Sequence, residues 1–324
     1  MKYYRRLLVA ITALILLLIP SIVAAQAGQG LEISPPLLSL NADPGQVLHA
    51  DMRVRNVTSQ TLLSHAQYND FVAGGEDGQP KILLNDTEQS PYSIKDWLGS
   101  IATVSLAPHE QKSIAVTITV PSNASPGGHY GVIRFTGTPP ELDQSAVSLS
   151  ASVGTLILVT VSGNIHEQAK LIEISTSQNN KNRSLFEYGP ITITARVQNT
   201  GNVHLQPQGT ITVTNMWGKR VANFQVNQSK GNVLPQSIRR FSVTLNNKLL
   251  FGRYKIMADV VYGKDSTIVS RSAYFWVIPY KLIVIILAIL VLIVFLIRRY
   301  NRLIVKRARK GSGDGAKKKS NKKS

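Results

Sequence analysis

An uninterrupted apolar run from Leu282 to Ile297 constrains this chain more than any other feature of its sequence. A helix of about 16 residues is roughly 24 Å long, slightly less than the hydrocarbon core of a bilayer, about 30 Å. The run therefore predicts a transmembrane helix over residues 279–297. A helix buried in a soluble core is the alternative, but it leaves the residues on either side of the run unexplained.

Those flanking residues are of the types found at membrane interfaces. Trp276, Tyr280 and Lys281 precede the run, and Arg298 and Arg299 follow it. Aromatic rings and a snorkelling lysine suit the outer interface, and arginines suit the cytoplasmic one. We therefore predict a single-pass protein of the cell membrane, in contact with the lipid bilayer, with an extracellular N-terminus and a cytoplasmic C-terminus.

The net charge of +18 is distributed unevenly along the chain. Residues 28–163 carry six basic and twelve acidic residues, and residues 164–278 carry fourteen basic and five acidic residues. Residues 298–324 carry twelve basic residues and one acidic residue, which predicts a disordered cytoplasmic tail. Because the excess flanks the apolar run, it indicates membrane topology, and we expect no nucleic acid as a partner.

The N-terminal residues 1–27 have the order of a secretory signal peptide. Basic residues come first, an apolar run from Leu7 to Leu18 follows, and small residues end the segment at Ala25 and Ala27. Cleavage after either alanine fits the rule, and an uncleaved first membrane helix is the alternative. The chain has no cysteine, which in an exported protein favours a bacterial cell envelope.

Between these two apolar segments the chain alternates with period two. Ile114, Val116, Ile118 and Val120 share one face of a predicted strand, and Pro-Gly and Gly-Gly turns recur between such runs. One short helix is predicted, over Ser93–Gly99. The fold class is therefore all-β, with two tandem immunoglobulin-like antiparallel β-sandwiches over residues 28–163 and 164–278.

The two predicted sandwiches share an order of landmarks. Each contains a strand that ends in asparagine, then a Leu-Pro or Leu-Ala-Pro bend before another strand, and last a Gly-x-Tyr strand entry. Asparagine can bond its own turn, and proline sets a bend. The residues are Asn56, Pro108 and Tyr130 in the first block and Asn199, Pro235 and Tyr254 in the second.

Catalytic motifs are absent from the sequence. It has no glycine-flanked serine elbow, phosphate loop, zinc helix or cysteine nucleophile, and its six histidines are scattered. We predict that the protein is not an enzyme and has no cofactor, metal or small-molecule substrate. Asp70, Glu76 and Asp77 surround a Gly-Gly turn and could hold calcium, although the ligand spacing of a calcium loop is missing.

Three aromatic residues are candidate contacts for a glycan or a protein partner: Tyr92, Trp97 and Trp217. Trp97 beside Asp96 suits stacking on a sugar, but packing under the end of the sandwich is the alternative. Trp217 precedes Lys219 and Arg220, and we predict that it lies at a hairpin tip or contacts a partner.

The chain resembles the WxL-interacting surface proteins of Gram-positive bacteria. The resemblance is carried by LEISPPLLSLNADPGQ, VRNVT, LAPHEQKSIAVTITVP and ASPGGHYGVIRF in the first block, and by VQNTGN, VLPQSIRRFSVTLNN and FGRYKIMADV in the second. It implies a first domain that binds peptidoglycan and a second that binds host or partner proteins, but it supplies no motif that assigns individual binding residues.

We therefore predict a non-catalytic, membrane-anchored protein that binds cell-wall peptidoglycan, wall-associated proteins, or both. The alternative is a chaperone-like or assembly factor that offers a β-sheet edge to exported proteins, since edge pairing needs no specific side-chain motif.

Overall fold

The computed structural model describes residues 30–85, 87–139 and 152–320, and the side chains among them up to Val305. The chain divides into two compact units, one built mainly of residues up to Ser162 and the other of residues from Gly163 onward. Val72–Lys81 and Pro126–Gly128 belong to the second unit. The predicted signal peptide and its cleavage sites lie outside the described residues.

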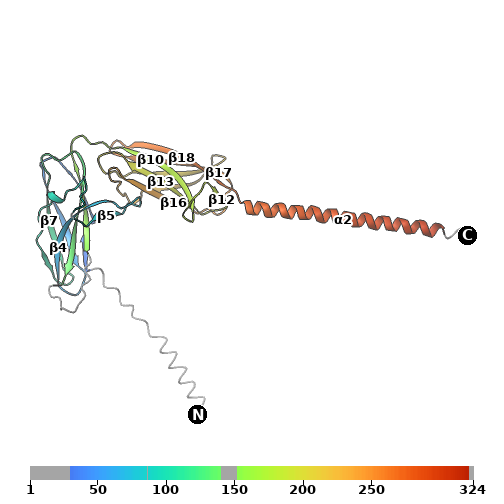
Figure 1. The fold of residues 1–324 in the computed structure, drawn as a ribbon, viewed down its shortest axis with the longest axis horizontal. Helices are drawn as coiled ribbons and strands as arrows, with labels where there is room; N and C mark the ends of the chain where they lie inside the picture. The colour runs from blue at the N-terminus through green and yellow to red at the C-terminus, as the bar shows by residue number, and fades with distance from the viewer. Residues whose placement is uncertain (1–29, 86, 140–151, 321–324) are drawn as a thin grey trace, which may run out of the picture. The chain divides into compact units, whose positions relative to one another are not determined.

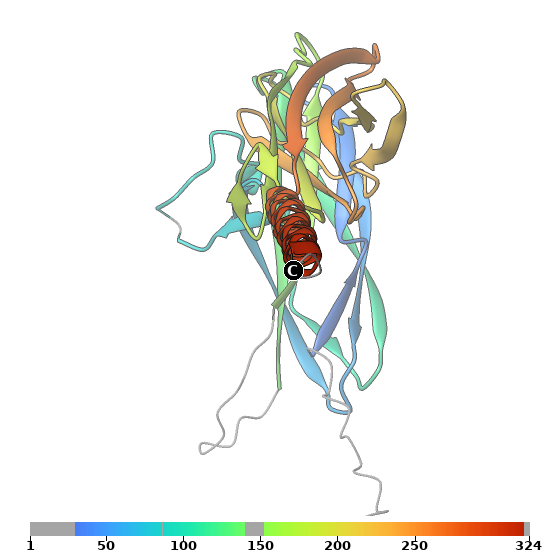
Figure 2. The same ribbon diagram turned by 90° about the vertical axis from the view of Figure 1, so that its right-hand side faces the viewer.

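The first unit is a sandwich of two β-sheets (Figure 1). One sheet has the order β1-β3-β7, and the other β2-β9-β8-β4-β5 with β6 on β4. Figure 2 shows β3 and β7 side by side as blue and teal arrows. The elements are β1 (Leu31–Ser34), β2 (Leu37–Ala42), β3 (Val47–Asn56), β4 (Leu62–Ala73), β5 (Pro80–Leu83), η1 (Lys95–Trp97), β6 (Val104–Leu106), β7 (Gln111–Thr119), β8 (Gly127–Thr138) and β9 (Ser152–Val161).

The second unit is also a sandwich, with one sheet of order β11-β10-β13-β16 and another of order β12-β18-β17-β14-β15. Its elements are β10 (Ala169–Gln178), β11 (Lys181–Asn182), β12 (Leu185–Phe186), β13 (Ile191–Asn199), β14 (Gln208–Asn215), β15 (Arg220–Val226), β16 (Ile238–Leu245), β17 (Gly252–Tyr262) and β18 (Thr267–Val277). The prediction of an all-β chain with two sandwiches is confirmed.

The two sandwiches share one topology. β1-β3-β7 corresponds to β10-β13-β16, and β2-β9-β8-β4 corresponds to β12-β18-β17-β14. In each, the first strand of the larger sheet pairs in parallel with the last strand, β2 with β9 and β12 with β18. The pairs β4–β8 and β14–β17, which correspond to each other, are both antiparallel. The repeat predicted from the order of landmarks is therefore present in the strand order.

The landmark asparagines hold equivalent corners of the two sandwiches. The Asn56 side chain is fully buried and donates to the carbonyl oxygens of Leu106 and Ala107, 3.1 and 3.0 Å away. Asn199 is also fully buried and donates to the carbonyl oxygen of Val233, 2.9 Å away. Each asparagine therefore ties the end of one strand to the bend before the next, through a side chain that is itself out of reach of water.

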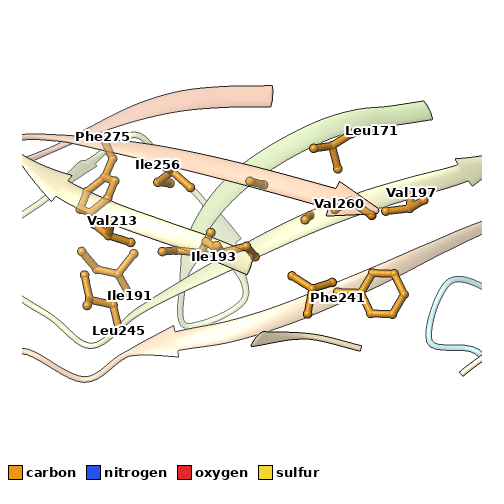
Figure 3. Packing of buried hydrophobic residues seen from close by; sticks show 14 of the residues in the cluster. Leu171, Ile191, Ile193, Val197, Val213, Phe241, Leu245, Ile256, Val260 and Phe275 are labelled. Carbon is orange, nitrogen blue, oxygen red and sulfur yellow. The ribbon is translucent and has the colours of Figure 1, made fainter. Parts of the chain in front are cut away.

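Each sandwich has its own hydrophobic core, built from the alternating residues of its strands. Ile114, Val116, Ile118 and Val120 are at most 7% exposed, as their period predicts. Figure 3 shows the second core, in which Ile191, Ile193 and Val197 of β13 face Val213, Ile256 and Phe275 of the other sheet. Burial of each such side chain contributes about 1.5–3 kcal/mol relative to leaving it in water.

Helix α2 (Tyr280–Ser320) is longer than predicted. Residues Tyr280–Val305 contain an 18-residue stretch with a mean hydropathy of 3.2 in which no residue is buried, so this part of the helix is long and apolar enough to cross a membrane. The prediction of disorder from residue 298 is wrong as far as Ser320, because the helix continues through the basic segment. Extension of a formed helix avoids the nucleation cost, and lysine and arginine are favourable near its C-terminus.

Candidate functional site

Tyr92 and Trp97 both lie in the segment that closes one side of the first sandwich. The predicted helix over Ser93–Gly99 is a single 3₁₀ turn, η1, within that range. Tyr92 is half-buried, and its ring meets the ring of Tyr130 edge-on at 6.0 Å. Tyr130 N–H donates to the Tyr92 carbonyl oxygen over 2.6 Å, so Tyr92 extends the sheet of β8.

Trp97 is half-buried against the first core and packs against a histidine. Its ring centroid lies 4.6 Å from that of His129, and His129 Nε2 lies 2.8 Å from the carbonyl oxygen of Ser125. Burial lowers the pKa of His129 below its ordinary value, which favours the neutral ring. The face of Trp97 that a sugar would need is therefore partly occupied by His129.

Trp217 differs from the other two candidates because it is 76% exposed. It lies in the turn between β14 and β15, where its backbone N–H donates to Asn215 Oδ1 over 3.1 Å. The side chain is free of the core and available to a partner.

The predicted membrane-interface residues lie at the two ends of the apolar part of α2. Trp276, the last residue but one of β18, is 47% exposed, and Tyr280, the first residue of α2, is 53% exposed. Lys281 Nζ lies 2.8 Å from a carboxylate oxygen of Glu187, which ties the start of α2 to the segment after β12. Arg298 and Arg299 lie within α2 and are exposed.

Two of the three acidic residues near the Gly74-Gly75 turn, Asp70 and Glu76, are committed to protein contacts, and Asp77 is exposed. Asp70 accepts hydrogen bonds from Ser90 N–H and Ser93 Oγ over 3.0 and 2.6 Å. Glu76, in the second unit, binds the Arg196 guanidinium, which lowers the Glu76 pKa. Among the described residues no group of three metal-ligating side chains occurs, so no candidate calcium site is formed there.

A groove in the second unit is the feature best suited to holding a partner. It runs between β15 of one sheet and β16 of the other and has a volume of about 790 Å³. Phe224, Val226, Phe241 and Val243 form its apolar lining. Both strands lie at a sheet edge, since β15 pairs only with β14 and β16 only with β13 among the described strands.

The backbone of β16 presents unpaired groups to this groove. Arg240 N–H points away from β13 and donates to the carbonyl oxygen of Glu76 over 2.7 Å. Because outward groups alternate in an antiparallel strand, the N–H and C=O groups of Ser242 and Thr244 share that edge. Within the described residues no backbone group pairs with them.

The equivalent edge of the first sandwich is covered by the chain itself. Gly99 N–H donates to the carbonyl oxygen of Thr117 on β7 over 2.8 Å, and Leu98 forms a bridge with Ile118. Ile94 of the same segment is fully buried in the first core. In the described part of the second sandwich no segment takes this place over Ser242–Leu245, so its edge stays open.

Sequence reasoning did not find this groove. The alternation of Phe241, Val243 and Leu245 predicts a strand, but it does not say which neighbours the strand has. The one available signal is that the second block lacks a counterpart of the Ser93–Gly99 segment.

His204 adds a pH-dependent term to the stability of the second unit. Burial lowers its pKa to about 4, from about 6.5 in an unfolded chain. Between these values the unfolded state binds more protons, so the free energy of unfolding should rise with pH from about 4 to about 6.5 and level off above. We expect the melting temperature to fall on acidification through this window.

The variant His204→Gln should lose that part of the pH dependence, because glutamine does not titrate. Melting temperatures measured in buffers from acid to neutral pH check this expectation. A variant that kept the full dependence of the parent protein would assign the effect to other groups.

No family model matches the chain, and no curated protein matches it. Among solved structures it is similar to the class 5 fimbriae chaperone CfaA, at 14% identity and a TM-score of 0.38 over 77% of this chain and 99% of that one. The Pseudomonas aeruginosa chaperone CupB2 is 12% identical with a TM-score of 0.35, over 76% of this chain and 100% of that one. The E. coli chaperone DraB is 14% identical with a TM-score of 0.35, over 76% of this chain and 96% of that one. At these identities and TM-scores the likeness says nothing about partners.

Proposed function

We propose that this chain is a membrane-anchored, non-catalytic binding protein that takes an extended segment of a partner protein along β16. The observation that carries the proposal is the open groove between β15 and β16, with the unpaired backbone groups of Ser242 and Thr244 at its edge. The same function, a β-sheet edge offered to exported proteins, is the alternative predicted from the sequence.

The chemistry of the groove suits an added strand. A partner segment beside Ser242–Leu245 would gain main-chain hydrogen bonds, which give affinity without a side-chain motif. Alternate side chains of that segment would point between the two sheets, toward Phe224 and Phe241, and would be selected for being apolar. A free sheet edge of this kind otherwise carries a risk of aggregation, which a dedicated partner removes.

Peptidoglycan fits this geometry less well than an extended protein segment does. Of the aromatic residues predicted to contact a glycan, Tyr92 packs on Tyr130 and Trp97 packs on His129. Trp217 is exposed, but it lies on the short turn between β14 and β15. Under the resemblance to WxL-interacting proteins, the partner would be a protein held at the bacterial cell wall.

The anchor in this proposal is α2. Its apolar stretch would cross the bilayer, with the basic residues from Arg298 onward on the cytoplasmic side and both sandwiches outside. Partner capture would then take place close to the outer surface of the membrane.

A substitution in β16 tests the proposal. Ser242→Pro removes the outward N–H, and an edge strand tolerates proline where its N–H faces solvent. The matched control is Ser242→Ala, because both variants lose the hydroxyl contact with Thr194 Oγ1 at 2.9 Å and only proline loses the N–H. We expect Ser242→Pro to weaken partner binding about tenfold or more, and Ser242→Ala to leave it nearly unchanged.

Binding is measured with the full chain in nanodiscs, by co-sedimentation with wall fragments of the producing bacterium. One preparation keeps its wall proteins, and the other is stripped to bare peptidoglycan. We expect co-sedimentation with the first only. Equal recovery on bare peptidoglycan would favour the glycan instead, and equal binding by the proline and alanine variants would exclude β16 as the site.

A further inference from the structure

The exposed apolar residues of the second sandwich are gathered at one end. Within residues 163–278, all of which are described, nine large hydrophobic side chains are exposed. One of them, Ile268, lies beside the β17–β18 turn. Tyr274 and Trp276 lie within three residues of the end of β18, and Leu185 of β12 pairs with Trp276. The remaining five occupy connecting loops. Those five are Tyr188, Met216, Trp217, Leu249 and Phe251, which we call the exit rim.

Strand register places the exit rim at the end from which the chain enters α2. Val277, the last residue of β18, pairs with Gly252, which follows Phe251 directly. Asn215, which directly precedes Met216 and Trp217, pairs with Tyr254 near the start of β17. Phe186, which lies two residues before Tyr188 in the chain, pairs with Val277. Trp217 is 76% exposed and Leu249 is 98% exposed, so these side chains are held out of the core.

The charges around the exit rim are almost all positive. Lys219, Arg220, Lys248 and Arg253 lie in or beside the same loops. The one carboxylate in the connecting segments 187–190, 215–219 and 246–251 is that of Glu187, and it is bound to Lys281. Exposed aromatic and aliphatic side chains among lysine and arginine match a bilayer interface with anionic lipid headgroups.

The length of the connection to α2 limits how far the exit rim can be from the membrane. Ile278 and Pro279 alone separate the end of β18 from the start of α2. Three peptide steps reach at most about 11 Å. The headgroup region on each side of a bilayer is about 5–8 Å thick. A rim tethered this closely to a membrane-spanning helix is within reach of the interface.

From these observations we infer that the exit rim docks the second sandwich onto the outer leaflet, with Trp217, Leu249 and Phe251 in the headgroup region. This inference rests on the membrane anchor of the proposed function. Docking would fix the height of β16 above the membrane and restrict rotation of the sandwich about α2, so that the open groove meets partners at a constant distance from the lipid surface.

The absence of cysteine allows a direct test, since any introduced cysteine is the single labelling site. The full chain is reconstituted into vesicles of phosphatidylcholine and phosphatidylglycerol, with a nitroxide label on Trp217→Cys or, separately, Phe251→Cys. Asp265→Cys, in the turn at the other end of β17, is the matched water-exposed control. Leu290→Cys, within α2, reports the anchor itself. Accessibility to oxygen and to a water-soluble nickel chelate is measured by electron paramagnetic resonance.

We expect an oxygen-to-nickel accessibility ratio several-fold higher at positions 217 and 251 than at 265. A ratio at 217 and 251 equal to that at 265, with a high ratio at 290, would overturn the docking and leave the anchor intact. Positions 217 and 251 shielded from both reagents would mean that protein covers the rim, which also overturns it. A low ratio at 290 would overturn the anchor and the docking together.

Discussion

Replacing Asn56 by alanine should lower the free energy of unfolding of the first unit by about 3–4 kcal/mol. The Asn56 amide donates to the carbonyl oxygens of Gln60, Leu106 and Ala107, and its Oδ1 accepts from Thr58 N–H and Thr58 Oγ1. Alanine would remove all the bonds that this fully buried side chain makes and would leave the buried carbonyl oxygen of Leu106 without this donor. Urea unfolding followed by the fluorescence of Trp97, the one tryptophan before residue 163, measures the change.

Asn199→Ala should have a similar effect on the second unit, because Asn199 makes the equivalent bonds to Val203, Val233 and Gly201. The control is Asn246→Ala, an exposed asparagine whose loss should change the free energy of unfolding by less than about 0.5 kcal/mol. A loss below about 1 kcal/mol at both buried positions would show that these corners are not what holds the strands to their bends.

Under the proposed anchoring, two arginines within the apolar stretch of α2 should release the protein from the membrane. Leu287 and Leu290 lie in the apolar stretch, with 55% and 52% of their surface exposed. Each arginine near the centre of a spanning helix costs about 2.5–3.5 kcal/mol of insertion free energy, so Leu287→Arg with Leu290→Arg costs about 5–7 kcal/mol. The measurement is the fraction of the protein that stays with membranes after carbonate extraction.

The matched control is Leu287→Ile with Leu290→Ile, which keeps the hydropathy and should keep the protein in the membrane fraction. Full retention of the double arginine variant would mean that α2 is not the anchor. Loss of the isoleucine variant would mean that the association depends on the shape of this helix, as in a contact with another protein, more than on its transfer into lipid.

Period-two alternation made the strands predictable from the sequence. Apolar residues recur at every second position from Ile191 through Ile193 and Ala195 to Val197, and this places them on one face whatever strands lie beside them. Asn56 and Asn199 marked equivalent corners because an asparagine at a strand end accepts a hydrogen bond from the backbone N–H two residues later, in its own turn. The helical tail up to Ser320 was missed because the prediction used the composition of the tail alone. Extending the helix that precedes the tail needs no new nucleation, and composition does not include this effect.

The amino-acid sequence by itself determined the fold class, the repeat of two sandwiches and the apolar stretch of α2, because these depend on local periodicity and on hydropathy. Tertiary structure alone decided which edge is open and which loops gather at the exit from the second sandwich. β16 is open because no segment among the described residues covers Ser242–Leu245, whereas Leu98 and Gly99 cover β7 in the first sandwich. Trp217 and Phe251 are 34 residues apart in the chain, and only the register of β14 on β17 brings them to one rim.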